Sequence, residues 1–184
     1  FSLTISKNRG LEQIIEIIKP FKDKVTLTLI GGMRGDFYEM HIKDNLEFID
    51  IIEPLSQKEL HLELSNHDVG LALEQTTANT NRGICLTNKL FAYCQAGLYV
   101  LATETPAQRL FLQHNEKFGE IISSQKSEGQ KLLRNVLDNI VSIRGEKNKR
   151  YRISKELLSF DVVSSEIIQN WKKNQRNDRL FKEY

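Results

Sequence analysis

The sequence has few of the residues that define specialised classes of protein. Its 184 residues include two cysteines, three prolines, two methionines and one tryptophan. Cys85 and Cys94 have neither the spacing of a metal site nor that of a CxxC motif, so we interpret both as reduced thiols of a cytosolic protein. No run of about 18 apolar residues is present, which argues against a membrane-spanning helix, and no signal-peptide pattern is visible.

Neither sign of charge is in excess. The formal net charge is +2, and 40% of the residues are hydrophobic while 27% are charged, which is ordinary for a globular protein. Acids and bases are mixed along the chain without a basic face, so we expect no nucleic-acid partner. The chain begins at Phe1 inside an apolar segment, and we interpret it as a piece of a longer protein.

Strand-like and helix-like segments alternate about six times with short connections between them. This alternation predicts an α/β fold, a Rossmann-like parallel six-stranded sheet with helices on both faces. Residues 1–142 form this domain, and residues 143–184 add a charged linker at 144–150 and C-terminal helices that pack on the domain or on a missing partner. The expected strands are Phe1–Ser6, Val25–Ile30, Leu46–Ile52, Val69–Leu73, Tyr99–Thr103 and Glu120–Ser123. The expected helices are Leu11–Ile18, a weaker one at Asp36–Lys43, one from Ser56 through Leu64, one from Thr87 to Gly97, Pro106–Lys117 and Glu128–Ile140.

The helix between Thr87 and Gly97 follows a long polar loop, which runs from Gln75 to Thr87. Its first backbone amides have no intrahelical partner, and the helix dipole is positive at this end, so an anion is stabilised there. This helix N-terminus is the strongest functional signal that the residues give by themselves.

In an open α/β sheet, ligands bind at the carboxyl ends of the strands. Arg9 follows the first strand, where its guanidinium either clamps a phosphate at two points or lies solvated on the surface. Lys7 is a weaker candidate at the same turn. Lys89 stands in the first turn of the central helix, where a cation opposes the dipole and so suggests a nearby anion, unless its side chain points to water.

Glu74 follows a predicted strand and so also lies at the carboxyl ends of the strands. A carboxylate there can accept hydrogen bonds from sugar hydroxyls or balance a positive group. The alternative is that Glu74 is simply an exposed loop acid. The glycine run at 31–35 fails the dinucleotide fingerprint, because G-x-G-x-x-G must follow the first strand and these glycines follow the second. The four histidines show no metal spacing, and no G-x-S-x-G elbow is present.

Four segments together resemble a known family. Asn88–Ala102 (NKLFAYCQAGLYVLA) is similar to the NKLFEYMAAGLPVVA segment of nucleotide-sugar glycosyltransferases of family four and their relatives, and Asp68–Leu73 (DVGLAL) resembles their ADIGLAPL strand. Ser6–Glu12 (SKNRGLE) looks like their G-R-x-x-K-G-L-E turn, and Leu29–Gly32 (LIGG) like their L-V-G-x-G strand end. The matches cover roughly residues 1–140.

The resemblance implies the C-terminal, donor-binding half of a GT-B enzyme, in which two Rossmann-like domains face a cleft, with the N-terminal acceptor-binding half missing. The substrate is then a UDP- or GDP-linked sugar, without a cofactor or a metal ligand. The implied localisation is cytoplasmic or at the inner face of the membrane, in polysaccharide or lipid-linked glycan assembly, with peripheral membrane association through the missing half. The site residues that the resemblance implies are Arg9 and Glu74 for catalysis and Lys7, Gly31, Gly32, Glu53, Pro54, Leu55, Thr87, Asn88 and Lys89 for donor binding.

Within this set, Arg9 and the helix N-terminus receive the donor diphosphate, Glu53–Leu55 hold the base largely by backbone, and Glu74 touches the hexose. One position departs from the family pattern. The second acid of the paired-glutamate motif falls at Ala92, whose side chain accepts no hydrogen bond. The alternative hypothesis is therefore a non-catalytic Rossmann-like interaction domain that has lost donor binding, and a third is a sugar-nucleotide epimerase of the same architecture.

Overall fold

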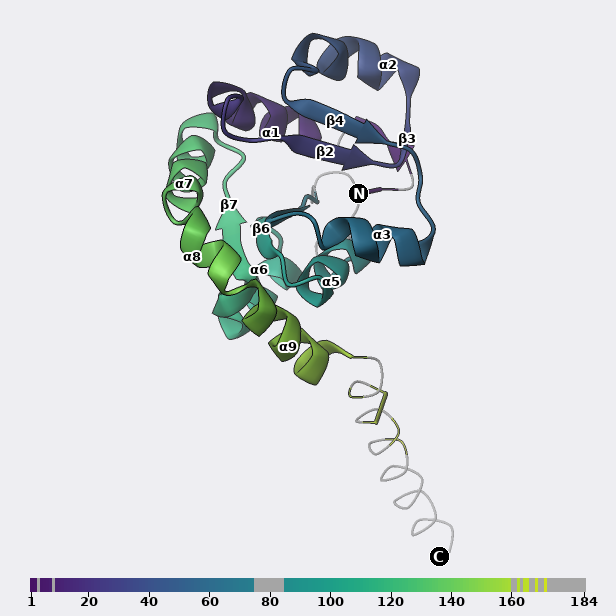
Figure 1. Ribbon diagram of the computed structural model, residues 1–184, viewed down its shortest axis with the longest axis vertical. Coiled ribbons are helices and arrows are strands. Elements are labelled where there is room, and N and C mark those ends of the chain that lie inside the picture. The colour runs from purple at the N-terminus through teal and green to yellow at the C-terminus, as the bar shows by residue number, and fades with distance from the viewer. Residues whose placement is uncertain are drawn as a thin grey trace, which may run out of the picture.

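The computed structural model describes residues 1–2, 4–7, 9–74 and 85–159, together with positions 162, 164, 165, 168 and 171. Most of the polar loop expected between Gln75 and Thr87 lies outside the described residues, as does most of the chain after Ser159. The described part is an α/β structure in which every strand pairing is parallel (Figure 1).

All six expected strands are present, and β3 is an additional one. They do not form one sheet, however. The described strands pair as two two-stranded sheets, β1–β3 and β2–β4, and one three-stranded sheet in the order β5–β6–β7, so the prediction of a single six-stranded sheet is not confirmed. The strands are β1 (Thr4–Ile5), β2 (Leu27–Ile30), β3 (Gly32–Met33), β4 (Ile49–Ile52), β5 (Val69–Ala72), β6 (Tyr99–Thr103) and β7 (Gly119–Ile122).

The sheets remain separate because of where the N-terminal segment lies. β1 pairs with β3, beyond the carboxyl end of β2, and the Ser2 amide donates to Ile30 O at 2.9 Å. Gly31 makes this crossing possible. Its φ is +137°, and a Cβ there would stand 1.8 Å from Ser2 O, so only glycine fits. Along β2 itself, no described strand pairs with the edge that faces away from β4.

The helices follow the strands closely, as expected for crossover connections. They are α1 (Leu11–Ile18), α2 (Gly35–Phe37), α3 (Gln57–Leu64), α5 (Asn88–Gln95), α6 (Pro106–His114), α7 (Lys126–Asp138), α8 (Ile140–Gly145) and α9 (Lys147–Leu158). Local signals explain several of their ends. Ser56 and Glu59 form a reciprocal capping box at the start of α3, and the Thr105 hydroxyl caps α6.

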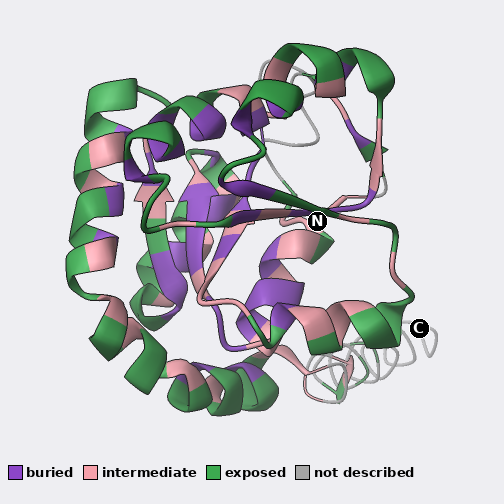
Figure 2. Ribbon diagram, turned by 45° about the horizontal axis from the view of Figure 1, so that its top comes forward, coloured by how far each residue is buried: buried purple, intermediate pink, exposed green. Residues whose placement is uncertain are grey.

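Helices cover both faces of the β5–β6–β7 sheet. Leu101 of β6 belongs to the apolar cluster that contains α1 and α7, whereas its neighbours Val100 and Ala102 belong to the cluster around α5 and α6. This is the alternation expected of a strand whose successive side chains point to opposite faces. Figure 2 shows buried residues gathered in the strands and on the helix faces turned toward them, while exposed residues follow the outer surface.

Residues 144–150, expected to be a charged linker, are helical instead. They lie in α8 and α9, which follow α7 along one side of the molecule (Figure 1). Lysine, arginine and glutamate are good helix formers, and Arg144, Lys147 and Arg150 all bind the domain. Arg150 donates to Gly97 O, and Lys147 Nζ donates to His67 O at 2.6 Å, so α9 packs on the end of α5.

Among the described helices, none combines the length and the apolar composition needed to cross a membrane.

Candidate functional site

A buried ion pair lies at the carboxyl end of β5. Glu74 follows this strand and is only 6% exposed, and its Oε1 lies 3.0 Å from Lys89 Nζ. The same ammonium also donates to Leu73 O at 3.3 Å. Thr103, the last residue of β6, bonds both backbone groups of Glu74 through its hydroxyl at 2.7 Å, accepting from the amide and donating to the carbonyl. The Glu74 backbone is therefore fixed, and its carboxylate holds Lys89 at this edge.

Helix α5 begins beside this pair and leaves its first amides open. Thr87 occupies the N-cap position with an extended backbone (φ −90°, ψ 154°), yet its hydroxyl makes no capping hydrogen bond. The Thr87 Oγ1 atom is buried and has no hydrogen-bond partner among the described residues. Buried hydroxyls are normally satisfied, and the amides of Asn88 and Lys89 have no intrahelical acceptor. Together these donors suit an anion at the start of α5.

One helical turn further along α5, Tyr93 meets the N-terminus of the chain. The Phe1 amine donates to Tyr93 Oη at 2.9 Å, and the two rings meet edge to face at 5.5 Å. Burial, and secondarily the charge of Lys89, lowers the pKa of this amine to about 5. Burial likewise raises the pKa of the Tyr93 phenol and raises that of the Cys94 thiol to about 12, so neither ionises near neutral pH.

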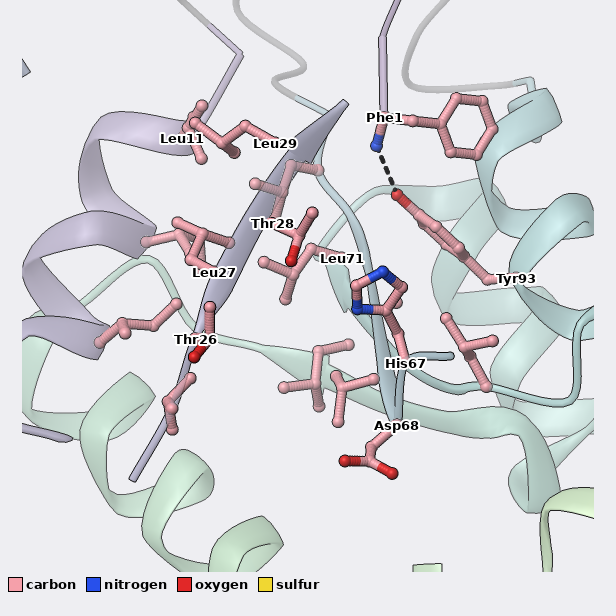
Figure 3. Close-up of a pocket in the computed structure, with 18 of the residues that line it drawn as sticks. Phe1, Leu11, Thr26, Leu27, Thr28, Leu29, His67, Asp68, Leu71 and Tyr93 are labelled. Carbon is pink, nitrogen blue, oxygen red and sulfur yellow. Dashed lines mark hydrogen bonds between the residues drawn. The ribbon is translucent and has the colours of Figure 1, made fainter. Parts of the chain in front are cut away.

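A cavity of about 550 Å³ lies between β2 and β5 and reaches this edge (Figure 3). Arg9 and Lys89 both line it, although they come from different ends of the sequence. Arg9 is half-buried, and no ion pair or hydrogen bond joins its guanidinium to another described residue. Arg9 and Lys89 thus line one cavity, and Lys89 stands in the first turn of α5.

Other candidates from the sequence lie elsewhere. Lys7 is exposed and forms an ion pair with Asp36 at 3.3 Å, which lowers the pKa of the Asp36 carboxyl. Gly31 and Gly32 both lie against the N-terminal segment. Gly31 contacts Ser2, and Gly32 pairs with Thr4 in the β1–β3 sheet.

The segment expected to hold the base follows β4. Glu53 and Pro54 are exposed and Leu55 is partly exposed, and none of the three lines the cavity. The structure therefore brings Glu74, Thr87, Asn88 and Lys89 together at the start of α5, and Arg9 lines the same cavity as Lys89. The remaining candidates lie outside this region.

Ala92, the position of the missing family acid, is 9% exposed and packs in the apolar cluster beneath α5. It does not line the cavity.

Two residues at the site were not among the predicted site residues. Thr103 is the last residue of a predicted strand, at the carboxyl end where the sequence places candidate ligand contacts. Tyr93 stands four residues after Lys89 on a predicted helix, so the two share a face.

Within the described residues, no group of three or more His, Cys, Asp or Glu side chains has the arrangement of a metal site.

No family model matches the sequence, and no curated protein matches it either. Solved structures of similar fold include two glycosyltransferases. One is AviGT4, a glycosyltransferase involved in avilamycin A biosynthesis, with a TM-score of 0.67 and 13% identity over 92% of this chain and 48% of that one. The other is WaaG, a glycosyltransferase involved in lipopolysaccharide biosynthesis, with a TM-score of 0.61 and 13% identity over 85% of this chain and 42% of that one.

At this level of identity the similarity concerns the fold alone. This chain has the fold of one domain of a GT-B glycosyltransferase, as the sequence resemblance predicted. It spans less than half the length of either similar protein.

Proposed function

We propose that this chain is the donor-binding half of a glycosyltransferase, which moves a sugar from a nucleotide-diphosphate donor to a glycan or lipid-linked acceptor. The observation that carries the proposal is the start of α5, where the buried Thr87 hydroxyl, which has no partner in the described part of the chain, stands with open backbone amides and Lys89. The glycosyltransferase fold of the two similar structures supports the same function.

In this proposal the diphosphate of the donor lies at the N-terminus of α5. The Thr87 hydroxyl and the amides of Asn88 and Lys89 donate to its oxygens, and Arg9 approaches from the cavity side. Charge accumulates on the diphosphate as the bond from the sugar C1 atom to its oxygen breaks. Preorganised donors and cations that meet this developing charge lower the barrier.

Glu74 has two parts in this scheme. Its carboxylate holds Lys89 at the edge, and the same carboxylate is assigned to contact a hydroxyl of the transferred sugar. The new bond forms between C1 and an acceptor oxygen, whose proton passes to a base. We assign that base and the acceptor site to an N-terminal half of the same chain, which also provides any peripheral membrane contact.

The remaining assignments follow from the family resemblance. Glu53, Pro54 and Leu55 would hold the base by their backbone, and Lys7, Gly31 and Gly32 are the further donor-binding residues that the resemblance implies. We place the protein on the cytoplasmic side of a membrane, in polysaccharide biosynthesis. No cofactor is invoked, and the donor is UDP- or GDP-linked.

Titration calorimetry with UDP, GDP and their sugar conjugates tests the proposal. We expect saturable binding of one nucleotide, and a loss of at least about tenfold in affinity for Arg9→Ala and for Thr87→Val, because each change removes a donor to the diphosphate. Arg34→Ala, at an exposed arginine beyond β3, is the matched control and should leave the affinity unchanged.

Binding that survives both Arg9→Ala and Thr87→Val would contradict the proposed site. If no nucleotide bound at millimolar concentration, the non-catalytic interaction domain would be the better description.

A further inference from the structure

The hydroxyl of Thr103 extends the contact between β5 and β6 beyond their paired residues. The described pairing of these strands ends at Ala72 and Ala102, so Glu74 lies two residues past the last paired position of β5. Thr103 Oγ1 accepts from the Glu74 amide and donates to the Glu74 carbonyl, both at 2.7 Å. Its contact with Ala72 O is longer, at 3.5 Å, so the single hydroxyl proton belongs to the Glu74 carbonyl. One side chain thus binds both backbone groups of Glu74.

The alternation of β5 directs the Glu74 side chain toward α5. Ala72 belongs to the apolar cluster around α5, and Leu73 belongs to the cluster on the opposite face. Glu74 is the next residue and therefore falls on the α5 face again. Its Oε1 lies there at 3.0 Å from Lys89 Nζ, and the two side chains are only 5% and 16% exposed.

Glu74 is consequently held from two sides. Thr103 holds its backbone from β6, and Lys89 holds its carboxylate from α5. With the backbone fixed, only the side-chain torsions remain to place the carboxylate, and the ion pair restricts these torsions. Such an arrangement keeps a binding group in one geometry before its ligand arrives.

We propose that Thr103 is a positioning residue for sugar recognition, whose hydroxyl fixes the Glu74 backbone so that the carboxylate meets a hydroxyl of the transferred sugar. The inference rests on the proposed function, which assigns that contact to Glu74. Thr103 does not touch the sugar in this scheme and acts only through Glu74.

The sugar contact and the diphosphate contact should therefore respond differently to residue 103. The proposed function places the diphosphate at the start of α5, where Lys89 also donates to Leu73 O at 3.3 Å and so keeps one anchor that does not involve Thr103. Loss of the Thr103 hydroxyl should weaken the sugar contact and leave the diphosphate contact in place.

Calorimetric titration of the protein with UDP, GDP and their glucose, galactose and mannose conjugates separates the two contacts. The conjugate that the unchanged protein binds most tightly is used for all variants. The ratio of its dissociation constant to that of the matching nucleotide isolates the sugar contribution, because the diphosphate is common to both. Thr103→Val and Thr103→Ala remove the hydroxyl, and Thr103→Ser keeps it and is the matched control. Urea denaturation checks that each variant is folded.

We expect Thr103→Val and Thr103→Ala to raise this ratio about three- to tenfold, as the loss of one hydrogen bond predicts, with the affinity for the nucleotide alone changed less than about twofold. Thr103→Ser should keep the ratio of the unchanged protein. On a Glu74→Ala background, Thr103→Val should not change the ratio further, because its effect passes through Glu74.

Equal ratios for the unchanged protein and Thr103→Val would overturn this inference alone, since nucleotide-sugar binding would still support the proposed function. The same rise in Thr103→Ser, or an undiminished further rise on the Glu74→Ala background, would also overturn it. If the unchanged protein bound none of the probes, the proposed function would fail and this inference with it.

Discussion

β2 and β6 are strands of similar composition in very different surroundings. Both are apolar runs with branched residues, LTLI and YVLAT. β6 has a neighbour on each edge and its three middle residues are buried, whereas β2 has a neighbour on one edge and borders a cavity on the other. An apolar run thus identifies a strand that is covered above and below, but says nothing about its two edges.

The same contrast separates the two halves of the molecule. The half built on β5, β6 and β7 is closed by α5, α6 and α9, and it carries the Glu74–Lys89 pair. The half built on β2 and β4 leaves one side open to the cavity. The Glu74–Lys89 pair therefore stands on the closed half, which can hold its side chains in one geometry.

The largest expected effect compares core leucines of the two halves. Leu90 on α5 is fully buried and lies away from the cavity, so Leu90→Ala should lower the free energy of unfolding by about 2–5 kcal/mol. Leu29 on β2 lines the cavity, so part of its surface already lacks contacts, and Leu29→Ala should cost only about 1–3 kcal/mol. Urea denaturation of both variants measures the difference. Equal losses would mean that the two halves are packed equally well.

A smaller effect should follow from releasing α9. Arg150 is 2% exposed, and its guanidinium donates to Gly97 O at 2.9 Å and to Ile143 O at 2.6 Å. Arg150→Ala removes both bonds and should lower the free energy of unfolding by about 1.5–3 kcal/mol. The exposed Arg152 on the same helix gives the control, since Arg152→Ala should change stability by less than about 0.5 kcal/mol. If the two variants were equally stable, Arg150 would not hold the closed half together.

The smallest effect concerns the ion pair between α8 and the start of β5. The bidentate hydrogen bond from Arg144 lowers the pKa of Asp68, so the carboxylate stabilises the folded state above about pH 4, and this contribution is lost as the pH falls further. Both side chains are partly exposed, so the pair is worth about 0.2–1 kcal/mol.

Denaturation of Asp68→Asn and of the unchanged chain at about pH 6 and about pH 2.5 measures this contribution. The stability gap between the two proteins should be present at the higher pH and close at the lower one. Asp138→Asn, at an exposed acid at the end of α7, is the control. A gap of the same size at both pH values would rule out the ion pair as its cause.

The sequence predicted the six strands because each is a short apolar run between turn residues, and such runs depend on local composition. It did not predict how the strands pair. Whether β2 meets another strand depends on where residues distant in the chain pass, as the crossing of Ser2 over Gly31 illustrates. The charged segment 144–150 was misassigned for a related reason. Its residues suit both linkers and helices, and contacts such as that of Arg150 with Gly97 decide between them.

The site was predicted as separate residues and not as an arrangement. Glu74 and Lys89 were each identified by their place at a strand end or a helix start. Their pairing depends on how α5 packs over β5, where the absence of a side chain at Gly70 leaves room for the Tyr93 ring. The unsatisfied Thr87 hydroxyl could not be predicted at all, because threonine at an N-cap usually bonds its own helix.

The connection of α9 to Gly97 has a mechanical consequence. The bond from Arg150 to Gly97 O holds the turn that joins α5 to β6, at the opposite end of α5 from the candidate site. A displacement of α9 would therefore act on this turn, and through it on both α5 and β6.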